Sequence, residues 1–254
     1  MLLLLLSLAI APGIAISVFI YSFRKMGSSS VRQMVISFVL GMCATVAPFL
    51  IQLASGDVRD EPYRQTIFSI AWFAFVIVAL TEEGSKYLVV RWYAYPLDQF
   101  REPFDGVIYS VMAGMGFATV ENIEYVWKFG LETGVSRMFL SVPAHAAFAV
   151  LMGYNIGLAK FQPRRKRWLM TKALLVVVLL HGSFDFFLFL LQNHAVRKYV
   201  SEGILSFCAF TSFYIAIRQA WKAIRLHAAR ERDDDQSDDD QVEDESQSGG
   251  REVN

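Results

Sequence analysis

The chain has 254 residues, of which 54% are hydrophobic, and its formal net charge is zero. Because the charges lie mostly between and after long apolar runs, this composition predicts a polytopic membrane protein. The runs leave no room for a separate soluble domain, so we expect an all-α transmembrane helix bundle at 1–225 and a tail at 226–254.

Seven apolar runs predict seven membrane spans. The first run has no basic residue before it and is longer than the apolar core of a signal peptide, so we expect a retained span. Cys43 and Cys208 both fall within spans, where we expect small core residues rather than a disulfide. The expected spans are 2–23, 34–54, 66–92, 105–127, 138–160, 169–192 and 201–221.

Basic residues gather in alternate connections between these spans. The positive-inside rule then places those connections and the carboxyl terminus in the cytoplasm, and the amino terminus outside. The chain is expected to be a multi-pass protein of the cell membrane. The run 164–167 is expected to touch lipid headgroups and no nucleic acid, and the acidic tail to be disordered. The cytoplasmic set includes Arg24, Lys25, Arg32, Arg91, Arg101, Arg164, Arg165, Lys166, Arg167, Arg218, Lys222 and Arg225, and the opposite set is Arg59, Arg64, Lys128, Arg137, Arg197 and Lys198.

The third span carries charges in its interior, in the stretch Thr81-Glu82-Glu83-Gly84-Ser85-Lys86. An ionised group near the bilayer centre costs on the order of 2.5–3.5 kcal/mol, so these residues need partners, water or a function. Lys86 lies three and four residues after the glutamates and can reach either carboxylate on the same helix. A purely structural ion pair between helices is the alternative to a functional role.

The fourth span brings a third buried carboxylate. Gly114 and Ala118 have the small-xxx-small spacing that lets another helix approach closely, and Glu121 and Asn122 follow within the next turn. Together with the third span, they suggest a polar cavity within the bundle. Glu124 lies nearer the helix end and is expected to reach the interface.

The fifth and sixth spans supply histidines. His145 follows Pro143, and His181 precedes Asp185 by four residues, a spacing that lets the carboxylate orient the imidazole. A lone histidine such as His145 is more often a packed residue than a ligand. The combination across four consecutive helices nevertheless provides acids, bases and metal ligands, which are the groups used to activate water.

These residues resemble the PrsW-type intramembrane proteases. The resemblance covers about 81–185 and rests on Glu82-Glu83-x-x-Lys86, Glu102-Pro103-x-Asp105-Gly106 with Tyr109, Gly114-x-Gly116-Phe117-Ala118-x-x-Glu121-Asn122, the lone His145, and His181-x-x-x-Asp185. The paired glutamates and later histidines are more distantly similar to the CAAX-processing and bacteriocin-immunity membrane proteases.

The resemblance implies an endopeptidase that cleaves a membrane-anchored protein, in the best-known relatives an anti-sigma factor, as the first cut of a regulated cascade. Glu82, Glu83, His145 and His181 would then be the catalytic residues. Lys86, Glu121, Asn122 and Asp185 would support them. Oligomeric state is left open.

Two mechanisms fit these residues. In one, Glu82 or Glu83 activates water, and an imidazole or Asn122 donates to the oxyanion; in the other, His145 and His181 bind Zn²⁺ with a carboxylate. Residue chemistry alone also allows a proton- or cation-coupled transporter, or a scaffold in which polar groups lock the helices. An inverted repeat, which would favour a transporter, is not visible.

Helix geometry gives an estimate of depth. At 1.5 Å per residue, Glu121, His145 and Asp185 fall in the outer half of the membrane, whereas Glu82 falls about 10 Å nearer the cytoplasm. A common outer level would open the site toward the exoplasmic face.

Overall fold

The computed structural model of the chain describes residues 2–23, 30–56 and 66–249, with side chains up to Leu226. Arg24, Lys25, Arg59 and Arg64, on which the predicted topology partly rests, lie outside the described residues. The described residues form helices without a strand, which confirms an all-α fold. In chain order the helices are α1 (Leu2–Ser22), α2 (Val31–Ala44), α3 (Val46–Ala54), α4 (Ile67–Trp72), η2 (Phe73–Leu80), α5 (Thr81–Val89), η3 (Val90–Ala94), α6 (Pro103–Phe129), α7 (Leu131–Phe139), α8 (Ser141–Phe161), η4 (Pro163–Arg165), α9 (Lys166–Gln192), α10 (His194–Arg197) and α11 (Glu202–Gly249).

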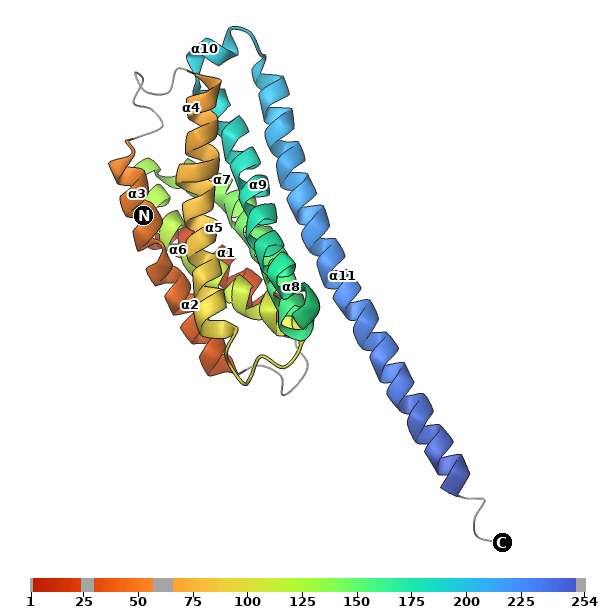
Figure 1. The fold of residues 1–254 in the computed structure, drawn as a ribbon. Helices are drawn as coiled ribbons and strands as arrows, with labels where there is room; N and C mark the ends of the chain where they lie inside the picture. The colour runs from red at the N-terminus through yellow and green to blue at the C-terminus, as the bar shows by residue number, and fades with distance from the viewer. Residues whose placement is uncertain (1, 24–29, 57–65, 250–254) are drawn as a thin grey trace.

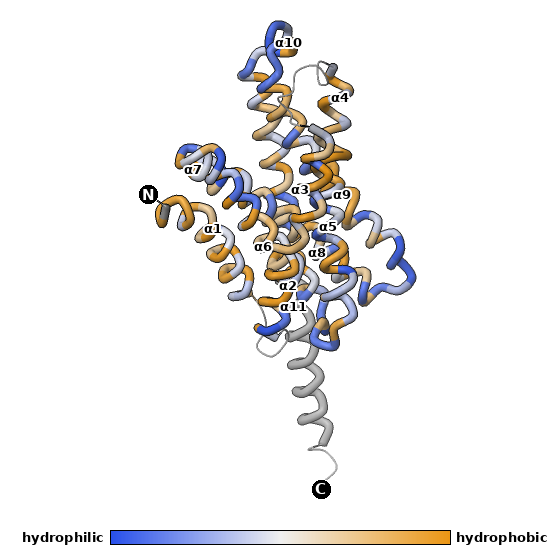
Figure 2. The backbone as a smooth tube through the Cα atoms, turned by 90° about the vertical axis from the view of Figure 1, so that its left-hand side faces the viewer, coloured by the Kyte–Doolittle hydropathy of each residue, from blue (hydrophilic) through white to orange (hydrophobic). Residues whose placement is uncertain are grey.

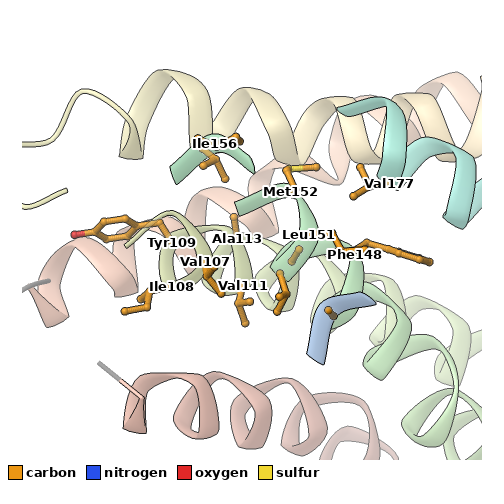
Figure 3. Close-up of a cluster of buried hydrophobic side chains, with 14 of the residues drawn as sticks. Val107, Ile108, Tyr109, Val111, Ala113, Phe148, Leu151, Met152, Ile156 and Val177 are labelled. Carbon is orange, nitrogen blue, oxygen red and sulfur yellow. The ribbon is translucent and has the colours of Figure 1, made fainter. Parts of the chain in front are cut away.

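Helix α6 is the centre of the bundle and packs against α8, α2 and α1. Glycines allow the closest approach: a Cβ on Gly106 would collide with the backbones of Gly153 and Gly157 on α8. Figure 3 shows the apolar side chains that fill the adjoining core, among them Val111 of α6 and Met152 of α8. The fold therefore rests on one closely packed helix pair, around which the other helices are arranged.

Six helical stretches of the described residues are long and apolar enough to cross a membrane: Leu3–Ser22, Val31–Ala54, Ile67–Ala94, Leu131–Phe161, Pro163–Gln192 and Glu202–Leu226. The remaining predicted span, the fourth at 105–127, corresponds to α6, which is not among them. Helix α6 can carry polar residues within the bundle because the neighbouring helices bury most of its side chains, Asp105 and Asn122 included. Figure 2 shows hydrophobic residues along the bundle and hydrophilic ones at α10 and α7.

The third span is continuous from Ile67 to Ala94, but it is not a uniform α-helix. Its middle, η2, is π-helical, and the π-helical η3 follows α5. Segments with i→i+5 hydrogen bonds are rare and are frequently found at functional sites. Here η2 ends at Leu80, directly before the charged stretch on α5.

At one end of the molecule, α4, α10, the end of α9 and the beginning of α11 extend beyond the other helices (Figure 1). A small second core holds this extension together, formed by Ile70, Leu190, Val196 and Leu205. The third and sixth spans are therefore longer than the others at this end, which residue counting from a common membrane boundary does not anticipate.

The predicted fifth span, 138–160, corresponds to α8, with a separate helix before it. Gly130 ends α6 with a positive φ of 83°, which favours glycine, and α7 then runs to Phe139 before α8 begins at Ser141. The short α7 packs against α6, α1 and α8. This segment, predicted to be a simple connection, is thus a structured part of the bundle.

The C-terminal helix extends beyond its apolar part. Helix α11 continues to Gly249 in a straight extension that leaves the bundle in Figure 1. The disorder expected for the acidic tail at 226–254 stays a prediction. A helix already formed over the apolar part of α11 can propagate at little cost, because nucleation is the expensive step. The charged composition of this last part of α11 disfavours packing against other helices. The helix can continue without such packing.

Candidate active site

Three helices bring four titratable side chains into one buried cluster. Glu82 and Glu83 come from α5, His145 from α8 and His181 from α9, and each is at most 4% exposed. One nitrogen or oxygen atom of each side chain lies within 4.8 Å of those of the other three. The sequence-predicted residues of the third, fifth and sixth spans therefore meet at one point.

Lys86 belongs to the same cluster. Its Nζ lies 2.7 Å from Oε1 of Glu83 and 3.8 Å from Oε2 of Glu82, so the lysine reaches both carboxylates as helix spacing predicts. It also lies 3.1 Å from Nδ1 of His145 and 4.1 Å from the centre of the Phe117 ring. The ammonium thus contacts two other helices, α8 and α6, besides the glutamates of its own helix.

Each histidine faces a carboxylate with its outer nitrogen. Nε2 of His145 lies 2.8 Å from Oε2 of Glu121, and Nε2 of His181 lies 3.2 Å from Oδ2 of Asp185. A carboxylate only accepts, so in neutral imidazoles both Nε2 atoms carry the proton and both Nδ1 atoms keep a lone pair. Both Nδ1 atoms point into the cluster, toward Lys86 and Glu83 respectively. Histidines that bind metals are typically held in this way by a carboxylate.

The buried oxygens of the cluster fit a cation. Nδ1 of His181 lies 2.9 Å from Oε1 of Glu83, and two acceptors this close need a proton or a cation between them. Among the described residues, Oε2 of Glu82 and Oε2 of Glu83 are buried and have no hydrogen-bond partner. Two imidazole nitrogens and two carboxylates form a donor set that zinc commonly takes. The residues therefore fit the metal that the sequence suggested.

Two partners of the cluster were not found from the sequence. Gln52 on α3 donates from Nε2 to Oε1 of Glu82 at 3.0 Å, and Arg137 on α7 lies 3.0 Å from Oε2 of Glu121. Gln52 is an ordinary polar residue within an apolar run, and Arg137 was one of the sparse charges of an outer connection. Neither residue lies at a helical spacing from a motif residue, because each reaches the site from a different helix.

Arg137 also contacts Asn122, whose Oδ1 accepts from Nε of Arg137 at 2.7 Å. The donation from Asn122 to an oxyanion that the sequence suggested would come from its Nδ2 and stays a prediction. The guanidinium lies 4.0 Å from the centre of the Tyr125 ring. Asn122 therefore holds Arg137 beside Glu121, and supports the cluster from one step further away.

The estimate of depth was wrong for Glu82. Its carboxylate is level with His145 and His181, not about 10 Å nearer the cytoplasm. Two features account for the difference: α4 extends beyond the neighbouring helices, and η2 winds more residues into each turn than an α-helix. Counting at the α-helical rise therefore overestimates how far Glu82 lies from the outer end.

The remaining motif residues position helices. Asp105 is fully buried and accepts from the backbone N–H groups of Arg101 and Glu102 at 2.7 and 3.0 Å, which caps α6. A Cβ on Gly114 would lie 2.8 Å from Cβ of Ala149, which confirms the close helix approach expected there. Glu124 pairs with Lys128 on the same helix, away from the cluster.

Comparison with known proteins points to one family. A family model described as PrsW family intramembrane metalloprotease matches residues 29–217. A protein named Protease PrsW from Bacillus subtilis (strain 168) is 35% identical over 191 residues, which is 74% of this chain and 84% of that protein.

Two further proteins of the same name are similarly related. The one from Geobacillus kaustophilus (strain HTA426) is 34% identical over 186 residues, covering 72% of this chain and 79% of its own. The one from Halalkalibacterium halodurans is 33% identical over 194 residues, covering 75% and 86%. No solved structure matches the chain.

Proposed function

The chain belongs to the PrsW family of intramembrane metalloproteases, and from this premise we propose that its hydrolytic centre is the cluster of Glu82, Glu83, His145 and His181. The protein is a multi-pass membrane enzyme that hydrolyses peptide bonds. The observation that carries the proposal is the convergence of these four buried side chains, within 4.8 Å, with each histidine backed by a carboxylate. Packing alone does not require that arrangement.

The metal would be held by Nδ1 of His145, Nδ1 of His181 and the carboxylate of Glu83. We propose zinc, since two histidines and a glutamate are a known catalytic zinc set with a position left for water. When bound, such a metal makes water a nucleophile at neutral pH and polarises the scissile carbonyl. Glu121 and Asp185 orient the two imidazoles from outside.

Glu82 is proposed as the general base. Its Oε1 is fixed by Gln52 at 3.0 Å, while its Oε2 has no hydrogen-bond partner among the described residues and can accept a proton from water. Glu83, by contrast, is engaged by both Lys86 and His181. The two adjacent glutamates therefore have different surroundings, which supports different roles.

The substrate is proposed to be a membrane-anchored protein, such as a membrane-bound regulator of the anti-sigma type. We further propose that the amino terminus is outside, the carboxyl terminus is cytoplasmic and the site opens outward. Glu121, Asp185 and Arg137 support this, because they are the partly exposed members, with side chains 13–17% exposed. Arg137 belongs to α7, which forms most of the connection between the fourth and fifth predicted spans, and that connection was predicted to be external.

The orientation can be tested by labelling. In a variant lacking Cys43 and Cys208, a cysteine replacing Glu132 on α7 should react in intact cells with a membrane-impermeant reagent. A cysteine replacing Arg165 should react only after the cells are opened. The reverse pattern would show that the proposed topology is inverted.

The function itself is tested on purified protein in nanodiscs. A panel of single-pass membrane proteins is offered to the wild type and to Glu82→Ala, Glu83→Ala, His145→Ala and His181→Ala, with metal content measured on the same samples. Cleavage should be lost in all four variants, and zinc in the Glu83 and histidine variants. Glu124→Ala is the matched control, since Glu124 pairs with Lys128 on the same helix, away from the cluster. Cleavage that survives all four substitutions would refute the site.

The transporter alternative is not favoured, because the family and the related proteins are proteases.

Removing metal provides a second test of the metal-dependent mechanism. A chelator should abolish cleavage, and zinc should restore it. Full cleavage by demonstrably metal-free protein would instead leave the activation of water to a glutamate.

A further inference from the structure

Lys86 occupies the position that a bound cation would need. Its Nζ lies 2.7 Å from Oε1 of Glu83 and 3.1 Å from Nδ1 of His145, two of the atoms that would hold a metal. The side chain is 4% exposed, so the ammonium is not a surface charge that happens to point inward. Within the bilayer, its charge offsets that of the buried carboxylates.

The lone pair on His145 cannot serve both cations. In the neutral imidazole of His145, the Nε2–H group donates a hydrogen bond to Glu121, so Nδ1 has a single lone pair, and this now accepts from Lys86. A metal on Nδ1 would therefore have to displace the lysine hydrogen bond. A divalent cation held by these two residues would also be strongly repelled by the ammonium beside it in a low dielectric.

We propose that Lys86 is a built-in counter-cation that competes with the metal for Glu83 and His145, and that it turns toward Glu82 when the metal binds. This inference rests on the proposed metal centre. It explains how two buried carboxylates and two imidazoles stay together during folding and membrane insertion, before any metal arrives. It also means that metal affinity is set by the lysine as well as by the ligands.

The destination of the displaced ammonium is available within the cluster. Oε2 of Glu82 lies 3.8 Å from Nζ and has no hydrogen-bond partner among the described residues. A carboxylate oxygen has two lone pairs, so one can accept from the ammonium while the other stays available to water. The face of the Phe117 ring lies 4.1 Å from Nζ, which stabilises a cation on that side. A rotation about the lysine side-chain bonds is enough for this change, without movement of a helix.

The first test measures zinc affinity, by competition with a chromophoric chelator, on full-length protein in nanodiscs. Lys86→Met removes the charge and the donor and keeps the length of the side chain. It should bind zinc about tenfold more tightly or better, because one charge-assisted hydrogen bond no longer has to be broken. Lys86→Arg keeps the charge and should stay closer to the wild type.

Lys160→Met is the matched control. Lys160 is also a partly buried lysine of the bundle, but its Nζ binds the carbonyl oxygens of Tyr95 and Leu97, away from the cluster. Its zinc affinity should equal that of the wild type. Thermal unfolding provides a readout if Lys86→Met is unstable without metal: zinc should raise the midpoint more in this variant than in the wild type.

A double-mutant cycle tests the destination. Glu82→Gln removes the charged acceptor, so it should weaken zinc binding when Lys86 is present and change it little in the Lys86→Met background. An equal loss in both backgrounds would show that Glu82 is itself a ligand, and would overturn the proposed turn of Lys86.

The outcomes separate this inference from the function it rests on. If the wild type binds zinc and Lys86→Met binds it no more tightly, the competition is refuted while the metal centre stands. A larger gain in Lys86→Arg than in Lys86→Met would refute it too. If neither the wild type nor Lys86→Met binds zinc, the metal centre fails and this inference fails with it.

Discussion

Helices α6 and α8 meet at two places that are built in opposite ways. At one end the contact is backbone against backbone: Gly106 lies against Gly153 and Gly157, with no side chain between the helices. At the other end Glu121 and His145 bridge the same two helices with a contact of 2.8 Å between charged and polar groups. The glycine contact therefore sets the distance between the two helices. At the polar end, this distance lets Glu121 reach His145 and orient its imidazole.

The largest effect should come from the polar end. Glu82→Gln removes the proposed base but keeps an oxygen that can accept from Gln52, so cleavage should fall by roughly 10²–10⁴-fold while the protein stays folded. Initial rates on a cleaved substrate and thermal unfolding are measured together. Glu124→Gln on the exposed side of α6 should change neither. Unaltered cleavage in Glu82→Gln would mean that the base lies elsewhere.

A smaller loss is expected where Arg137 supports the polar end. Arg137→Ala leaves Glu121 without its guanidinium, which weakens the hold of Glu121 on His145, so zinc affinity should fall by about 10–100-fold. Arg137→Lys should rescue only part of it, because lysine lacks the planar fork that reaches both Glu121 and Asn122.

Lys128→Ala is the control for this experiment, since Lys128 pairs with Glu124 at the surface. Its zinc affinity should not change. If Arg137→Ala lowers only the unfolding temperature and leaves zinc affinity intact, then Arg137 holds α7 in place and does not act on the site.

The glycine end should respond in stability alone. A Cβ on Gly157 would collide with the backbone of Pro103, which cannot give way as a flexible side chain can. Gly157→Ala should therefore destabilise the protein by about 1–3 kcal/mol, measured by thermal or denaturant unfolding. The folded fraction should retain normal cleavage per molecule. Loss of cleavage in fully folded Gly157→Ala would show that the two ends of the helix pair are coupled.

The smallest effect is expected at Gly84, the glycine between the charged residues of α5. Nothing lies within 4 Å of a Cβ placed there, in contrast to Gly157. Gly84→Ala should be neutral or stabilise the helix by up to about 1 kcal/mol. Strong destabilisation would mean that Gly84 packs against a surface supplied by another molecule.

Much of the site could be predicted because its parts repeat at helical spacing. Lys86 reaches Glu83 three residues away, and Asp185 reaches His181 four residues away, as the helix period requires. The apolar runs likewise predicted the seven long helical stretches of the bundle, although most of α6 is buried among its neighbours. Within one helix, neighbours follow from the backbone alone.

Contacts between helices could not be predicted from helical spacing. Arg137 and Gln52 could not be assigned to the site, and Glu82 was placed at the wrong depth, because each depends on how far one helix is shifted along another. The protruding α4, the π-helical η2 and the separate α7 all change that shift. None of them has a periodic signal in the sequence.

The sequence by itself determined that this is a helical membrane protein with glutamates, histidines and a lysine inside its spans, and which of them share a helix face. Only the tertiary structure decided that Glu121 backs His145, that both Nδ1 atoms point inward, and that Lys86 lies between the metal-ligand candidates. The physical reason is that the helix period is set by backbone hydrogen bonds, whereas the offset and rotation of one helix against another are set by side-chain packing.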